Sequence, residues 1–174
     1  MKFNKFSVLL SVAACLLLAV SGFAQTATFS DNSVEYTFDL PEATWKMTAK
    51  PSSTSPNVEY VYGDRQNAHL EVRKMTLKTD AALSDLIGDE EQKLQFLPGY
   101  VTGKQEDFKG SFGGKVFNYE FVRSARSMSG RFYFLKTDAK TVYVLRFTGQ
   151  LEKLRSIRNQ TDSIARTFDL KKSK

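Results

Sequence analysis

The chain has 174 residues, a formal net charge of +6, one histidine and one cysteine. This length fits a single domain of ordinary size with a core of its own. One histidine and one cysteine are too few ligands for a zinc or iron–sulfur centre, so we expect no metal and no cofactor.

The first 24 residues have the pattern of a signal peptide. Lys2 and Lys5 form a basic start, residues 6–20 form an apolar run, and Ala24 ends a small-residue stretch typical of a cleavage site. The run is short for a membrane span, which needs about 20 apolar residues, and no other segment approaches that length. We therefore predict an exported protein, periplasmic or secreted, whose mature domain comprises residues 25–174 and has no transmembrane segment.

A lipoprotein signal is the alternative interpretation of the same segment. Residues 12–14 before Cys15 resemble the site at which a bacterial cysteine is lipidated. The apolar run continues through residues 16–20, however, where a lipoprotein usually turns polar, so cleavage after Ala24 is preferred over a lipid anchor on Cys15. With that cleavage the only cysteine is lost, and the mature protein has no disulfide.

The first part of the mature chain is predicted to be mostly strands. Alternating apolar residues and turn residues predict strands at 27–29, 34–40, 44–48, 58–62, 69–77 and 100–109, with a hairpin across 63–67. One helix interrupts them, beginning after Asp80 and ending at Pro98. Its apolar side comprises Leu83, Leu86, Ile87 and Leu94.

The most strongly patterned region follows at residues 113–168. Three aromatic-rich strands are predicted at 114–125, 130–136 and 141–149, with turns at 127–130 and 137–140. Period-2 alternation predicts one shared apolar face made of Phe117, Tyr119, Phe121, Phe132, Phe134, Tyr143, Leu145 and Phe147. A helix over 151–168 is expected to cover that face with Leu151, Leu154, Ile157, Ile164 and Phe168.

The order of these elements indicates the fold class. Strands, a helix, more strands and a last helix do not alternate as in a doubly wound parallel sheet. The short turns between the last three strands make neighbouring strands antiparallel. We therefore predict an α+β fold, with an antiparallel sheet of about six strands flanked by helices.

Two segments resemble the PsbP-like group of proteins. Tyr36, Phe38, Pro41 and Trp45 resemble its opening pattern, and residues 143–148 before the final helix resemble its closing segment. The group includes the PsbP subunit of photosystem II, a Ran-binding nuclear protein and bacterial DcrB-like envelope proteins. The resemblance implies an antiparallel sheet between helices, an α/β/α sandwich, in proteins that mostly act by docking to partners. No shared site motif allows partner-binding residues to be carried over.

Patterns that indicate catalysis are sparse. His69 lies in a predicted strand without the partners of a nucleophilic triad. Asp89, Glu90 and Glu91 are adjacent, so their carboxylates point in different directions, and a solvated acidic face is preferred over a cation or hydrolase site. We therefore expect no enzyme, and a hydrolase using this acidic cluster is the least favoured class.

Two further segments have weak resemblances to nucleotide-binding and RNA-binding motifs. Residues 110–115 lack the spacing of a phosphate-binding loop and lead into a strand instead of a helix. Residues 130–134 have the aromatic pattern of an RNA-binding strand, but Phe132 and Phe134 are assigned to the core. We expect no nucleic-acid partner.

Charge is unevenly distributed along the mature chain. Residues 25–120 contain 10 basic and 15 acidic residues, a net charge of −5, whereas residues 121–174 contain 13 basic and 4 acidic residues, a net charge of +9. A basic region of this kind attracts anionic partners. Some of this charge is also expected to form ion pairs within the final helix, as between Glu152 and Arg155.

The leading hypothesis is an exported, non-catalytic docking module whose basic C-terminal third meets an anionic protein or envelope surface. The candidate partner-binding residues are Arg123, Arg126, Arg131, Arg155 and Arg158. The alternative is a carrier of a small hydrophobic ligand, with a pocket between sheet and helix lined by residues such as Phe121, Phe134 and Phe147.

Overall fold

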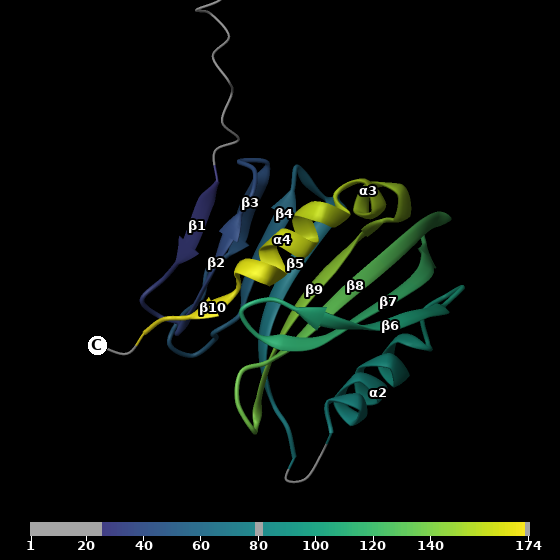
Figure 1. Cartoon of the computed structure of the whole chain (residues 1–174). Helices are drawn as coiled ribbons and strands as arrows, with labels where there is room; N and C mark the ends of the chain where they lie inside the picture. Colours follow the sequence, from purple (N-terminus) through teal and green to yellow (C-terminus); the bar gives the residue numbers. More distant parts are fainter. Residues whose placement is uncertain (1–25, 79–81, 173–174) are drawn as a thin grey trace, which may run out of the picture.

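The structure is a computed structural model that describes residues 26–78 and 82–172 (Figure 1). The described residues confirm an α+β fold, since strands build two antiparallel sheets and helices pack on them. The elements in chain order are β1 (Ala27–Ser30), β2 (Tyr36–Leu40), β3 (Trp45–Ala49), β4 (Val58–Tyr62), β5 (Asp64–Thr76), α2 (Leu83–Leu94), β6 (Val101–Lys109), β7 (Gly113–Arg123), β8 (Arg126–Lys136), β9 (Thr141–Gln150), α3 (Leu151–Ser156), α4 (Arg158–Thr167) and β10 (Asp169–Leu170).

The larger sheet has seven strands where about six were expected. Its order is β3-β4-β5-β9-β8-β7-β6, and the smaller sheet has the order β1-β2-β10. The predicted hairpin between residues 58–62 and 69–77 is confirmed by the antiparallel pairing of β4 with β5. The last strand before the three aromatic-rich strands, β6, is an edge strand, and nearly all of its residues are exposed.

Helices cover both faces of the seven-stranded sheet (Figure 1). On one face α2 contributes Ile87 and Leu94 to an apolar cluster. On the other face α3 and α4 contribute Leu154 and Ile164 to a second and larger cluster, which also includes side chains of β1 and β2. The two central strands β8 and β9 are therefore buried on both faces over most of their length.

The prediction of a single apolar face for the last three long strands is partly wrong. The aromatic residues predicted for this face on β7 and β8 do share the α2 face, but Tyr143, Leu145 and Phe147 of β9 lie in the cluster on the opposite face. The cause is the register of the β8–β9 pair: Lys136 pairs with Val142 instead of Thr141, so that five residues lie between the paired residues instead of four. A one-residue change in register moves every side chain of a strand to the other face.

The turn between β7 and β8 also differs from its predicted position. It was expected at residues 127–130, but Arg123 pairs with Arg126, so the turn consists of Ser124 and Ala125. These two residues have positive φ angles of 50° and 59°. Two consecutive left-handed residues are the requirement of a tight two-residue hairpin, and sequences usually meet it with Asn-Gly. Because Ser124 and Ala125 do not have that signature, the sequence pattern did not predict the turn at this position.

The final helix is interrupted, and it covers only the β9 part of the predicted apolar face, since the residues predicted for that face on β7 and β8 lie under α2. The predicted helix at 151–168 is divided into α3 and α4 at Ile157, whose φ and ψ are −102° and 17°. Ile157 stays buried with Leu154 and Ile164, so the break changes the direction of the chain without losing the apolar contact. Phe168 follows α4 in an extended conformation and is fully buried.

The remaining predictions on the termini and the first helix are tested in part. Helix α2 forms where expected, and its N-terminus is closed by the Asp85 carboxylate, which accepts from the Ala82 backbone N–H. Asp80, the proposed signal peptide at 1–24 and Cys15 lie outside the described residues. Within residues 26–78 and 82–172, none of the helices has the length and hydropathy of a membrane span.

Candidate functional site

Strand register brings distant segments to one end of the seven-stranded sheet. A single row of paired residues crosses the sheet through Ala68, Gly149, Ser129, Glu120 and Val101. The β7–β8 turn lies beyond this row, and α3 begins two residues after Gly149. These two segments therefore occupy the same end of the molecule (Figure 1).

Three of the predicted arginines gather at this end of the sheet. Arg123 and Arg126 flank the β7–β8 turn and are exposed. Arg155 projects from α3 with 63% of its side chain exposed and forms an ion pair with Glu152 at 2.9 Å. We call Arg123, Arg126 and Arg155 the arginine end. Their positions suit contact with a partner, because none of them is needed inside the core.

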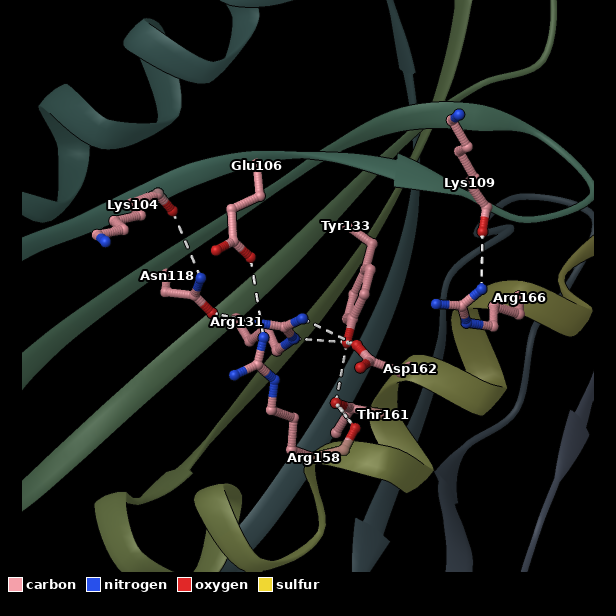
Figure 2. Close-up of polar contacts among 10 residues, drawn as sticks. All are labelled: Lys104, Glu106, Lys109, Asn118, Arg131, Tyr133, Arg158, Thr161, Asp162 and Arg166. Atoms are coloured by element: carbon pink, nitrogen blue, oxygen red, sulfur yellow. Dashed lines mark hydrogen bonds and ion pairs between the residues drawn. The ribbon is translucent and has the colours of Figure 1, made fainter.

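Arg131 is buried, so its prediction as a partner-binding residue is wrong. The residue is only 7% exposed, and its guanidinium binds groups from three elements (Figure 2). Nη1 donates to the Asn118 side chain at 2.6 Å, Nε to the Tyr133 hydroxyl at 2.6 Å, and Nη2 to Asp162 of α4 at 2.8 Å. A buried charge with this set of partners ties α4 to the sheet and is unavailable to a partner protein.

The protonation states around Arg131 are fixed by burial and by neighbouring charge. Burial raises the pKa of the Tyr133 hydroxyl, and the hydrogen bond that it donates to Asp162 raises this pKa further. Burial lowers the pKa of the Arg131 guanidinium, but Tyr133 and Asp162 outweigh this effect and raise it overall. The group therefore stays a cation held by neutral and anionic acceptors, which is the arrangement of a structural tie rather than of a proton-transfer site.

Arg158 lies at the edge of an open groove. The groove has a volume of about 430 Å³ and lies between β6 and the helices α3 and α4. Arg158 faces Glu106 of β6 across it, with their charged atoms 3.8 Å apart (Figure 2). Its lining is formed by Val101, Thr102, Gly103, Lys104, Glu106, Asn118, Tyr119, Glu120, Ser129, Gly130, Arg131, Leu151, Leu154, Arg155 and Arg158. Most of these side chains are polar or charged, which does not suit a hydrophobic ligand.

A bulge shapes the β6 wall of this groove. Thr102 pairs with Tyr119 and Gln105 with Phe117, so two residues of β6 lie opposite Asn118 alone. A Cβ atom on Gly103 would lie 2.5 Å from the Asn118 carbonyl oxygen. Glycine is therefore required where β6 approaches β7 most closely, and the bulge disrupts the regular edge of the sheet.

An exposed apolar feature that the sequence pattern did not predict lies at the same end. Phe96, in the connection between α2 and β6, is 88% exposed, and Val122 and Val101 are also unusually exposed for their size. Phe96 is two residues from Pro98, whose carbonyl accepts from the Val122 backbone N–H at 2.7 Å. The sequence does contain a signal for this exposure, since Phe96 does not lie on the apolar side of the helix to which Leu94 belongs.

The proposed hydrophobic pocket does not have the expected lining. Phe121 and Phe134 belong to the cluster under α2, whereas Phe147 belongs to the cluster on the opposite face of the sheet. These three side chains cannot line one cavity. The error follows from the register of β9 described above.

The acidic cluster of α2 is spread over separate structural contacts. Glu90 binds Lys93 one turn away, while Glu91 accepts from the hydroxyls of Tyr100 and Thr102. His69 lies 2.8 Å from the Glu59 carboxylate on neighbouring strands. In the part of the chain that the structure describes, no three His, Cys, Asp or Glu side chains are grouped to hold a metal ion.

Comparison with known proteins gives similarity in structure alone. No protein-family model matches the chain, and no curated protein sequence does so. Among solved structures, cyanobacterial PsbP from Synechocystis is similar with 15% identity and a TM-score of 0.56, over 87% of this chain and 96% of that one. LpqN of Mycobacterium tuberculosis, which is involved in cell envelope biogenesis, gives 15% identity and a TM-score of 0.55, over 85% and 91%.

A third similar structure is the Ran-binding protein Mog1p of Saccharomyces cerevisiae, with 9% identity and a TM-score of 0.62, over 84% of this chain and 96% of that one. Identities this low establish the fold alone. The residues behind the sequence resemblance agree with this, since Tyr36, Phe38 and Trp45 are all buried in the larger apolar cluster. The described domain therefore has the PsbP-like fold.

Proposed function

We propose that this protein is an exported, non-catalytic binding protein that docks the arginine end on an acidic surface of a partner protein. The observation that carries this proposal is that exposed arginines and an exposed aromatic side chain lie at the same end of the sheet. Similarity to an envelope-biogenesis protein and to a Ran-binding protein supports a binding role in a related fold.

The composition of this end matches that of protein interfaces. Aromatic residues and arginine are enriched at the centres of interfaces, and a few such residues provide most of the binding energy. Phe96 supplies an apolar side chain that the fold itself does not use, since it is almost wholly exposed. Arg126 and Arg155 supply charge on either side of the sheet end.

Charge determines the class of partner. The region after residue 120 has a net charge of +9, and its exposed arginines favour approach of an acidic surface. Such pairs at an interface rim act mainly on the association rate and are weakened by salt. A docking surface of this kind gives binding that depends on both ionic strength and Phe96.

Site-specific crosslinking in the native host tests this proposal. A photoreactive amino acid replaces Phe96 in one variant and Lys46 in a control, because Lys46 is exposed on the edge strand β3 at the far side of the sheet. The proposal predicts one discrete adduct with an acidic protein from position 96 and none from position 46. Equal labelling from both positions would contradict it.

Purified protein gives the second arm of this test. Binding to vesicles that contain anionic lipid is measured beside vesicles of neutral lipid at the same concentration. The proposal predicts no saturable binding to either. Strong binding to the anionic vesicles that is lost in Arg126→Gln/Arg155→Gln would replace the protein partner with a membrane surface.

A further inference from the structure

The face of the seven-stranded sheet that carries α2 is only partly covered by this helix. The apolar cluster under α2 includes Phe134, Val142 and Val144. Further along the same face, toward the arginine end, Arg146 and Thr148 of β9 lie beside Glu71 and His69 of β5. Arg146 and Thr148 follow Val144 at intervals of two, so they lie on the same face. Glu71 and His69 lie on this face as well, because they pair with Arg146 and Thr148.

This uncovered part of the sheet contains a small basic pocket. Its volume is about 170 Å³, and it is lined by Arg65, His69, Glu71, Arg123, Met128, Arg146 and Thr148. The strands β5, β7, β8 and β9 thus contribute to one site through their register. We call it the basic basin.

Arg146 is a lining residue of the basic basin with an unusual hydrogen-bond environment. Its Nε atom is buried and has no hydrogen-bond partner among the described residues. Its Nη2 atom makes a long hydrogen bond of 3.3 Å to the Tyr119 hydroxyl, and its guanidinium lies 5.0 Å from the centre of the Phe132 ring. A buried N–H of a charged group without an acceptor is costly, so this position is suited to an anion.

The nearest acid does not neutralise Arg146. Glu71 lies directly opposite it on β5, but the Glu71 carboxylate accepts instead from Nε of Arg73 at 2.7 Å. Glu59, the other acid of this face, binds Arg65 at 3.5 Å and His69 at 2.8 Å. Four arginines thus share two carboxylates, which leaves an excess of two positive charges: Arg65, Arg73, Arg123 and Arg146 against Glu59 and Glu71.

Aromatic rings hold two of these arginines in place. Arg123 lies over the Phe121 ring at 5.4 Å, as Arg146 lies over Phe132. Stacking of this kind restricts a guanidinium and leaves its N–H edge free to donate. The planar edge of arginine matches the two oxygens of a carboxylate or of a phosphate.

We propose that the basic basin binds the oxyanion group, carboxylate or phosphate, of a small molecule. The Arg146 guanidinium donates to one oxygen, and Arg123, which also lines the basin, supplies the second positive charge. The volume of the basin accommodates the charged group and a few further atoms, so the rest of the ligand lies outside the basin. The basic basin shares Arg123 with the arginine end, but Phe96, Arg126 and Arg155 do not line it.

Arginine side-chain N–H resonances test the proposal directly in the wild-type protein. Inorganic phosphate and acetate are titrated separately at constant ionic strength and neutral pH, and the Nε–Hε signals of Arg146 and Arg155 are followed by NMR. The proposal predicts a saturable shift of the Arg146 signal with at least one of these ions, and no saturable shift of Arg155, which is exposed outside the basin. The ion that saturates at lower concentration identifies the chemical class.

Substitutions provide the second measurement. Arg146→Gln is expected to weaken oxyanion binding about tenfold or more, as followed by the Thr148 backbone amide, because a charged hydrogen bond is lost. Arg123→Gln, at an exposed position, gives an independent variant should Arg146→Gln not fold. The control Lys46→Gln, at an exposed position of the edge strand β3, is expected to bind as the wild type does. Absence of saturation with both ions, or equal affinity in all variants, would overturn the proposal.

Discussion

Arg131 of β8 and Asp162 of α4 form an ion pair at 2.8 Å that joins the sheet to the last helix. Because Arg131 is nearly fully buried, the pair connects the core of the sheet to the helical layer beside the groove. Asp162→Asn removes the negative charge and keeps the shape of the side chain. We expect this variant to lower the free energy of unfolding by about 1.5 to 3 kcal/mol, measured by urea denaturation.

A matched control separates this tie from surface ion pairs. Glu152→Gln removes the partner of Arg155, and both of these side chains are mostly exposed. Its effect on the free energy of unfolding is expected to stay within about 0.5 kcal/mol. Equal losses in the two variants would show that Arg131 and Asp162 contribute no more than a surface pair.

Glu35 gives the stability of the protein a dependence on acidic pH. Hydrogen bonds from Lys74 and Tyr143 lower the pKa of Glu35 from 4.5 to about 2. A carboxylate with a lowered pKa in the folded state stabilises the protein above its unfolded pKa, and this contribution is lost as the pH falls toward the folded pKa. We expect Glu35→Gln to be less stable than the wild type above pH 4.5, and the difference to vanish near pH 2. Urea unfolding at a series of pH values measures it, and a constant difference would contradict the assignment.

The tight turn between β7 and β8 predicts a stabilising double substitution. Ser124 and Ala125 both have positive φ, which costs free energy in residues other than glycine and asparagine. Ser124→Asn/Ala125→Gly is expected to raise the free energy of unfolding by about 1 kcal/mol or more. The same pair placed at 127 and 128, inside β8, should lower it, because glycine weakens a strand and the Met128 side chain is buried. If the variant at 127 and 128 were the more stable of the two, the turn would instead lie at 127–130, where the sequence pattern predicts it.

Two adjacent glycines in β7 differ in the space around them. A Cβ atom on Gly114 would lie 1.9 Å from the Phe134 carbonyl oxygen, whereas one on Gly113 would meet no atom within 4 Å. Gly114→Ala is expected to cost about 1 to 3 kcal/mol through backbone displacement, and Gly113→Ala to be near neutral. Thermal or urea unfolding of both variants measures the contrast. Similar stability of the two variants would mean that β7 and β8 separate easily at this point.

The sequence pattern predicted most strands but could not assign all of their faces. Alternation works where one face is polar, and it fails for β8 and β9 because both faces of these strands are buried. The face of Phe147 then depends on the length of one loop, and the residues at 137–141 fit a four-residue and a five-residue loop equally well. The turn at Ser124 was missed for a related reason, since neither of its residues is typical of left-handed backbone.

The candidate site was predictable in its charge and not in its geometry. Counting charges located the basic C-terminal third, but the count cannot distinguish Arg131, which is buried, from Arg155, which is exposed. Nor could it reveal that Arg146 and Phe132 face the basic basin, because that depends on strand pairing across β5, β8 and β9. The exposure of Phe96 was not predicted, because the sequence pattern does not show whether another element covers a side chain in the α2–β6 connection.

The most direct test of the docking account is the affinity for the partner that is crosslinked through position 96, measured with purified proteins over a range of salt. Three variants are compared with the wild type: Phe96→Ser, Arg126→Gln/Arg155→Gln, and the charge-matched control Lys46→Gln/Lys78→Gln at exposed positions away from the arginine end. The account predicts wild-type affinity that falls with salt, about tenfold or more weaker binding for Phe96→Ser, and a weaker salt dependence for the arginine variant. Affinity that is independent of salt, or that falls equally in the lysine control, would contradict it.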